Sequence, residues 1–180
     1  MRILDNEEIR TIISAVGTGI GNDFNIEHLK YNKVIIMADA DQDGAHIRAI
    51  LLTFFYRYMR ELINTGHVYV AIAPLYKIYK KNFEKYVYNE EDYDAIVKEA
   101  GSGYNVARFK GLGEMSAEQL WETTMNPAKR VLVKVTIDDA ADAEEMISTL
   151  MGDNIDARKK YIIANANFNK VDKFENRSKK

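Results

Sequence analysis

Apolar residues recur along this chain at two spacings, one typical of helices and one of strands. Helical spacing over residues 6–16 predicts a first helix, capped by Asp5 or Asn6 and ended by Gly17. Its apolar side consists of Ile9, Ile12, Ile13 and Val16. The glycines at 17, 19 and 21 follow this helix and open none, so they predict a turn and not a dinucleotide-binding loop.

An unbroken apolar run at residues 33–38 predicts a strand that is buried on both faces. Helical spacing returns over residues 44–64 and predicts one long helix. Its core stripe is predicted to be Ile47, Leu51, Phe54, Phe55, Tyr58 and Leu62. Residues 67–79 then predict a second strand, with Pro74 near an edge or a bulge. Strand, helix and strand in this order imply a right-handed parallel crossover and an α/β fold.

Shorter elements are predicted for the rest of the chain. They are strands at 83–88, 104–109 and 129–137, and helices at 90–100, 138–150 and 156–164. A further helix is predicted to begin at Ser116, with Gln119 as its box partner, and to stop at Asn126-Pro127. Its packed face is predicted to be Ala117, Leu120, Trp121 and Thr124.

Three alternating aspartates follow the first predicted strand. If that strand continued through Asp39 and Asp41, the spacing of two would put both carboxylates on one face. Two such oxygen donors suit Mg²⁺, which binds one or two carboxylates together with water and substrate phosphate. Asp43 is predicted to cap the long helix. The start of that helix favours a bound phosphate, which makes His46 and Arg48 candidate contacts.

Other interpretations of these aspartates account for less of the pattern. An EF-hand loop counted from Asp39 would place Ile50 where a bidentate Glu is needed. A Walker B strand lacks support, because the chain contains no Walker A motif. A solvated helix cap explains Asp43 but not Asp39 and Asp41, whose mutual repulsion is costly without a cation.

Composition narrows the function classes. The chain has 180 residues, 47% of them hydrophobic and 29% charged, with a net charge of −2. Nucleic-acid binding would therefore depend on local basic patches, such as the interleaved lysines and aromatics around Lys77. A solvated antiparallel hairpin explains that stretch equally well. The absence of cysteine excludes disulfides and thiol catalysis. No apolar run suggests a signal peptide or a membrane span, so we expect a cytoplasmic protein with no membrane partner.

Several long motifs, in order, resemble the Toprim part of the B subunits of bacterial type IIA topoisomerases, the DNA gyrase and topoisomerase IV group. Beside the segment from Asp39 to Arg48, they are Gly17-Thr18-Gly19-Ile20-Gly21, Pro74-Leu75-Tyr76-Lys77, Lys110-Gly111-Leu112-Gly113-Glu114-Met115, Gln119-Leu120-Trp121-Glu122-Thr123-Thr124-Met125-Asn126-Pro127 and Leu150-Met151-Gly152-Asp153. The resemblance covers nearly the whole chain. Motifs shared by gyrase and topoisomerase IV do not distinguish the two.

This resemblance implies a Mg²⁺-dependent part of the centre that cleaves and reseals double-stranded DNA, with Mn²⁺ or Ca²⁺ able to substitute. Asp39 and Asp41 would be the catalytic metal ligands, and Asp43 a weaker one. His46, Arg48, Lys77, Lys110 and Arg158 would contact DNA. The implied partner is an A subunit that carries the nucleophilic tyrosine, in a tetramer of two A and two B subunits. ATP would bind elsewhere in the complete subunit.

The implied fold is a Rossmann-like Toprim domain with a mostly parallel sheet, lacking its first strand, followed by a smaller α+β region. The family's Glu-Gly-Asp-Ser-Ala motif, which supplies a third metal carboxylate, is absent from this sequence, so we expect the chain alone to be inactive. The predicted division is a partial Toprim core at 1–80, a hairpin region at 81–109, a C-terminal region at 110–168 and a basic disordered tail at 169–180.

Two other functions are compatible with the sequence. The chain could be a docking module for the A subunit without metal chemistry, or a nuclease-like or primase-like Toprim enzyme. The motifs around Lys110 and Trp121 speak against the latter.

Overall fold

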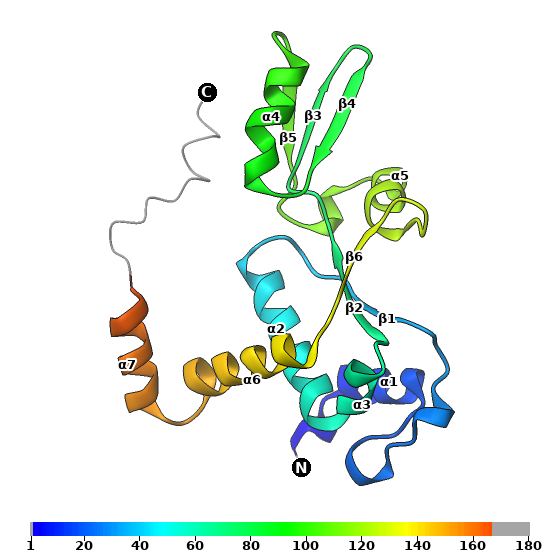
Figure 1. The fold of residues 1–180 in the computed structure, drawn as a ribbon, viewed down its shortest axis with the longest axis vertical. Helices are drawn as coiled ribbons and strands as arrows, with labels where there is room; N and C mark the ends of the chain where they lie inside the picture. The colour runs from blue at the N-terminus through cyan, green and yellow to red at the C-terminus, as the bar shows by residue number, and fades with distance from the viewer. Residues whose placement is uncertain (1, 167–180) are drawn as a thin grey trace. The chain divides into compact units, whose positions relative to one another are not determined.

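The computed structural model describes residues 2–166 (Figure 1), so the tail predicted at 169–180 lies outside the described residues. The chain divides into two compact units, Met1–Glu144 and Glu145–Lys180. Within the described part of the chain, no helix combines the length and the apolar character needed to cross a membrane.

The first unit contains a three-stranded mixed sheet in the order β1-β2-β6. β1 (Val34–Ile36) pairs in parallel with β2 (Val68–Ile72), as the predicted crossover requires, and β6 (Val131–Lys134) pairs antiparallel with β2. The helices that belong to this part are α1 (Glu7–Val16), α2 (Gln42–Tyr58) and α3 (Arg60–Asn64). Their apolar sides share one core with the strands, which includes Ile36, Val68, Phe54, Phe55 and Leu62.

A second, antiparallel sheet has the order β4-β3-β5. Its strands are β3 (Tyr76–Lys80), β4 (Phe83–Val87) and β5 (Asn105–Arg108), and α4 (Glu90–Ala100) packs beside them (Figure 1). A separate small core joins Tyr76, Ile78, Val87 and Ala100. The stretch of lysines and aromatics around Lys77 is therefore a hairpin within a small antiparallel sheet, which was one of its two interpretations.

Two predicted elements are interrupted by the fold. The strand predicted over 67–79 ends before Pro74, and its two halves belong to different sheets, because proline has no N–H to donate to a ladder. The long helix predicted over 44–64 begins at Gln42 and breaks at Met59, whose backbone angles are φ −139° and ψ 40°. Met59 is 1% exposed, so the break places an apolar side chain in the core.

The predicted core stripe of this helix is correct in its middle and wrong at its start. Phe54, Phe55 and Leu62 are buried, whereas Ile47 is 51% exposed. Thr53, which is not part of the predicted stripe, is buried as well, at 7% exposed. Leu51 is the first residue of this helix that packs against the core.

The helix that begins after Ser116 has an unpredicted geometry. Ser116 and Gln119 form the expected capping box, but only α5 (Ala117–Leu120) is an α-helix, and a π-helical turn follows at Trp121–Met125. The wider turn, closed by Asn126 N–H donating to Trp121 O (2.8 Å), rotates the faces of the helix. Trp121 is consequently 52% exposed, while Thr123 and Thr124 are buried.

A reciprocal cap begins α6 (Ile137–Met151), the helix that crosses the boundary between the units. Thr136 Oγ1 (2.6 Å) and its backbone N–H (2.9 Å) both donate to Asp139 Oδ2, and Asp139 N–H donates back to Thr136 Oγ1 (3.2 Å). The hydrogen bond from the Thr136 hydroxyl, followed by that from its backbone, holds the pKa of the Asp139 carboxyl below its ordinary value near 3.8.

We expect the Asp139 cap to stabilise the fold at neutral pH and to lose its effect in acid. A lowered folded-state pKa gives stability that is present above the unfolded pKa and disappears as pH falls through the folded pKa. Asp139→Asn should therefore lower the free energy of unfolding by up to about 1 kcal/mol near pH 7, and the difference should disappear as pH falls through the folded-state pKa of Asp139. Urea unfolding across pH checks this. Asp138→Asn is the matched control, and an identical pH curve for both variants would contradict the prediction.

The second unit holds the remainder of α6 and the helix α7 (Ile155–Asn165), whose N-terminus is capped by the Asn154 side chain. Gly152 follows α6, as predicted. Arg158 Nη2 donates to Gly152 O (2.6 Å), so this side chain ties the start of α7 to the end of α6.

Candidate metal and nucleic-acid site

Asp39 lies just beyond the C-terminal end of β1, where ligand crevices of open α/β sheets form. The strand stops at Ile36 and does not continue through Asp39 and Asp41, so the condition for a shared strand face is not met. The chain instead folds back on itself at the start of α2. A Cβ at Gly44 would lie 2.1 Å from the backbone oxygen of Asp39, so this close approach requires a glycine.

Asp41, and not Asp43, caps α2. Asp41 Oδ1 accepts from Gly44 N–H (2.8 Å), whereas Asp43 lies exposed in the first helical turn. The helix begins earlier than predicted because Asp41 supplies the cap. His46 and Arg48 therefore lie in its second turn, where the helix dipole acts less on a bound anion.

A loop from distant sequence holds the Asp39 carboxylate. Leu112 N–H donates to Asp39 Oδ1 (2.8 Å), a contact between residues 73 positions apart. A Cβ at Gly111 would lie 2.8 Å from Asp39 Oδ2, so the Gly111 backbone packs directly against this carboxylate. Glu114 Oε2 accepts from Lys110 N–H (2.9 Å) and closes the same loop. The structure thus places the backbone of Lys110 beside the loop that contacts Asp39; the metal role of Asp39 and the DNA role of Lys110 stay predictions.

The carboxylates of Asp39 and Asp41 are ligands of the chemical kind that Mg²⁺ binds. Asp39 and Asp41 each use Oδ1 for a backbone hydrogen bond, and the other oxygen of each has no hydrogen-bond partner among the described residues. No three His, Cys, Asp or Glu side chains within residues 4–166 are grouped so that they could hold one ion. Asp43 therefore does not complete a three-aspartate cage. Water and phosphate would have to supply the remaining ligands, which is the coordination Mg²⁺ commonly keeps.

The predicted DNA contacts fall into different surroundings. Lys77 Nζ pairs with Glu84 (2.9 Å) and its side chain is only 16% exposed. The hydrogen bond to Glu84, opposed in part by desolvation, raises the pKa of Lys77. The Lys77 ammonium is already paired with a carboxylate of the same hairpin, so the structure does not support its use for phosphate binding. Lys110 is exposed, and no ion pair joins it to another described residue.

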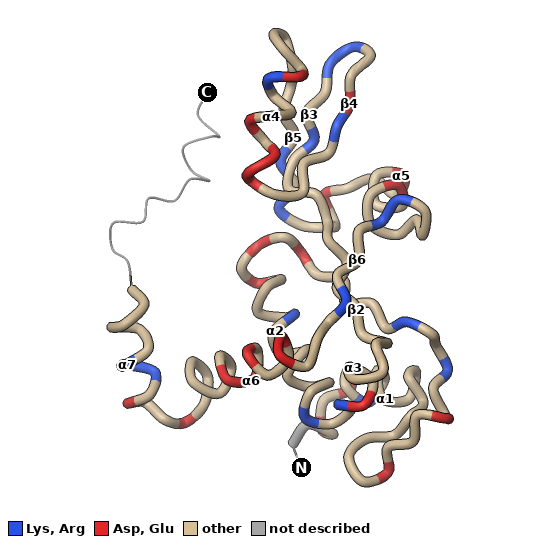
Figure 2. The backbone as a smooth tube through the Cα atoms, in the orientation of Figure 1, with Lys and Arg blue, Asp and Glu red and all other residues tan. Residues whose placement is uncertain are grey.

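Arg158 belongs to the second unit and acts there as a tie to Gly152. Its role in DNA binding remains a prediction. Figure 2 shows acidic positions along α4 and α6, and basic positions on the β3–β4 hairpin and on α7.

Sequence reasoning missed Gly111 and Leu112 as neighbours of the Asp39 carboxylate. From the sequence, the glycines near Lys110 indicate only a flexible loop. A backbone N–H is present at almost every residue, so sequence carries no signal for the bond from Leu112.

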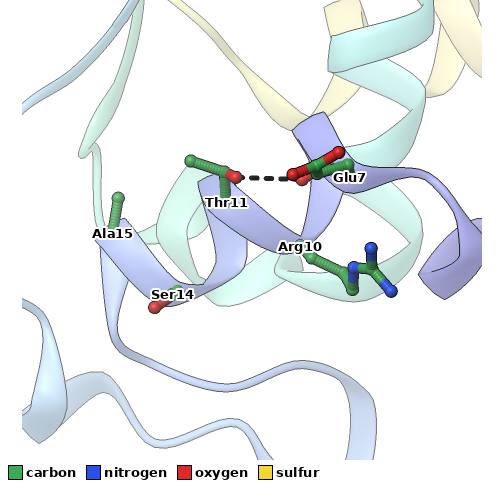
Figure 3. A pocket seen from close by; sticks show the side chains of 5 residues that line it. All are labelled: Glu7, Arg10, Thr11, Ser14 and Ala15. Carbon is green, nitrogen blue, oxygen red and sulfur yellow. Dashed lines mark hydrogen bonds between the residues drawn. The ribbon is translucent and has the colours of Figure 1, made fainter.

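A separate hollow of about 450 Å³ lies on the exposed side of α1 (Figure 3). Its lining residues Glu7, Arg10, Thr11, Ser14 and Ala15 all belong to that one helix. The Thr11 hydroxyl donates to the Glu7 backbone oxygen (2.9 Å) and so serves the helix itself. The hollow contains none of the predicted site residues, so it is not a candidate for the metal or DNA contacts.

Comparisons with known proteins find similarity to the same group of proteins along most of the chain. The Toprim domain family matches residues 2–72, and the family described as the carboxyl terminus of the DNA gyrase B subunit matches residues 101–163. The DNA gyrase B subunit of Treponema denticola is 53% identical over 173 residues, which cover 95% of this chain and 27% of that protein. The DNA topoisomerase 4 B subunit of Bacillus subtilis is 54% identical over 170 residues, which cover 92% and 26%. The chain spans about a quarter of the length of the curated relatives it matches.

Proposed function

Because this chain belongs to the family of DNA gyrase and topoisomerase 4 B subunits, we propose that it forms the magnesium-binding part of a type IIA topoisomerase cleavage centre. The observation that carries the proposal is the pair Asp39 and Asp41 beyond β1, each with one carboxylate oxygen available to a cation. Gyrase and topoisomerase 4 relatives match at nearly equal identity, so the proposal covers both types of enzyme.

A divalent ion held there would orient a DNA phosphate and stabilise charge on the attacking and leaving oxygens. Asp39 and Asp41 supply the negative charge that binds the ion. Hydrogen bonds from Leu112 and Gly44 fix the orientation of these two carboxylates. Lys110, next to the Asp39 contact, would hold a neighbouring phosphate by charge.

The proposal extends to the partners of the complete protein. It would act on double-stranded DNA in the cytoplasm, in a tetramer with an A subunit that carries the nucleophilic tyrosine. ATP would be bound and hydrolysed by another part of the B subunit. Mn²⁺ or Ca²⁺ could occupy the site in place of Mg²⁺.

Metal binding by the chain should depend on both aspartates. We expect weak Mg²⁺ or Mn²⁺ binding, in the millimolar range, because only two protein carboxylates contribute. Asp39→Ala and Asp41→Ala should each weaken it strongly, and calorimetric titration measures the difference. Asp43→Ala should weaken it less, because Asp43 lies exposed in the first turn of α2. Equal affinity in wild type and Asp39→Ala would contradict the proposed site.

DNA binding by the chain should be electrostatic and modest. Each lost phosphate contact reduces the slope of log affinity against log salt by about one. Lys110→Ala should show this reduction, and Arg158→Ala should if that cation also meets DNA. Lys77→Ala should change the slope less, because Lys77 pairs with Glu84. Fluorescence anisotropy at several salt concentrations measures these slopes, and a salt-independent affinity would contradict the prediction.

One observation favours the alternative, a non-catalytic docking module for the A subunit. The second unit exposes large apolar side chains, with Met151 56%, Ile155 60% and Ile163 80% exposed. Such surface is typical of partner binding. The decisive test is a chimera in which this chain replaces the matching quarter of the Bacillus subtilis topoisomerase 4 B subunit. Combined with the A subunit, it should support Mg²⁺-dependent DNA cleavage, whereas assembly without cleavage would favour the docking module.

A further inference from the structure

Asp39 is held in place through both its backbone and its carboxylate. Its backbone oxygen lies against Gly44 and its carboxylate against Gly111, and in each case a methyl group would not fit. Leu112 N–H adds a charge-assisted hydrogen bond of 2.8 Å. The start of α2 thus restrains the Asp39 backbone, and residues 111–112, which are distant in sequence, restrain its carboxylate.

Apolar packing holds the restraining loop in place. Ala40, the neighbour of Asp39, faces a dry gap beside Pro74, Phe109 and Met115, which has no room for a water molecule. Phe109 and Met115 flank residues 110–112 in sequence, so this packing anchors the loop on both sides of Gly111. Glu114 Oε2, which accepts from Lys110 N–H, adds a polar anchor.

We propose that Gly111 and Leu112 are positioning residues that hold the Asp39 carboxylate in one orientation, with Oδ1 occupied by the Leu112 N–H and Oδ2 left to bind the cation. The inference rests on the proposed function, since a positioning role requires that the Asp39 carboxylate binds the metal ion. Groups that orient metal ligands typically account for about 10- to 100-fold in metal affinity or activity. Gly111 acts through its lack of a side chain, and Leu112 through its backbone N–H.

Two glycines in this region provide a matched pair of substitutions. A Cβ at Gly111 would meet the Asp39 carboxylate, whereas a Cβ at Gly113 would meet nothing within 4 Å. Neither glycine has a positive φ, so alanine is compatible with both backbones. Gly111→Ala should displace the Asp39 carboxylate, and Gly113→Ala should not.

The test compares these variants in the full chain and in the chimeric B subunit. Gly111→Ala should weaken Mn²⁺ binding by about 10- to 100-fold and raise the Mg²⁺ concentration needed for cleavage by a similar factor. Binding of DNA without metal should be unchanged, which separates loss of positioning from loss of fold. Gly113→Ala should resemble wild type in all three measurements. Similar behaviour of the two variants would overturn the proposal.

The Leu112 amide gives a readout that needs neither metal nor activity. In wild type its proton should exchange slowly with solvent and resonate downfield by NMR, and both properties should be lost in Asp39→Ala. An unchanged Leu112 resonance would overturn the positioning role even if Asp39 is essential for cleavage. If instead the resonance moves as expected but Asp39→Ala leaves metal binding intact, the proposed metal site fails while the hydrogen bond stands. This measurement also decides the proposal if Gly111→Ala does not fold.

Discussion

Replacing Asp39 by alanine in the chimeric B subunit is expected to reduce Mg²⁺-dependent DNA cleavage by at least about 100-fold, since residues that merely orient metal ligands already cost about 10- to 100-fold. Asp39 is the carboxylate that the Leu112 N–H and the adjacent Gly111 backbone restrain. Cleavage would be measured as linear DNA released from a supercoiled plasmid over a range of Mg²⁺ concentrations.

Two controls separate loss of a ligand from loss of structure. Circular dichroism of Asp39→Ala should match wild type, because the side chain lies beyond β1 and outside the apolar core. Asp43→Ala removes a carboxylate from the same segment, but from an exposed position in the first turn of α2, and should reduce cleavage far less. If cleavage survives Asp39→Ala, this carboxylate has no part in the chemistry, and docking of the A subunit becomes the better account of the chain.

Local patterns in the sequence were enough to predict most of the elements. Gly17 and Gly101 end helices where expected, with φ of 87° and 70°, because a left-handed backbone at these points favours glycine. The capping box of Ser116 and Gln119 was also predictable, since both partners lie within one helical turn. The Toprim fold class is confirmed by the family match at residues 2–72.

The features that escaped prediction depend on contacts between distant residues. The break at Met59 contains no proline or glycine, and its cause is burial of an apolar side chain that only the assembled core defines. Pro74 separates two sheets instead of marking a bulge. This was not predictable, because apolar periodicity does not tell which sheet each half of a segment joins. Apolar periodicity also says nothing about the close approach of Gly44, which turns the chain at Asp39 and prevents the strand from continuing.

Gly44→Ala is expected to lower the free energy of unfolding by about 1–3 kcal/mol, the typical cost of forcing a group into filled space. Helix propensity alone predicts the opposite sign, since alanine is favoured over glycine in a helix by about 1 kcal/mol. The two effects differ in sign, so a single substitution decides between them. The clash should dominate, because the new Cβ would lie 2.1 Å from a backbone oxygen that cannot rotate away.

Urea unfolding of the full chain measures this difference, with two substitutions as references. Ala45→Gly, in the same turn and exposed, should cost about 1 kcal/mol from propensity alone. Gly113→Ala, with nothing near its Cβ, should be close to neutral. A stabilised Gly44→Ala variant would show that the Asp39 backbone does not lie against α2. The restraint on Asp39 would then come from Gly111 and Leu112 alone. If the clash is instead present and Asp39 moves to relieve it, the folded Gly44→Ala protein should bind Mn²⁺ more weakly than wild type.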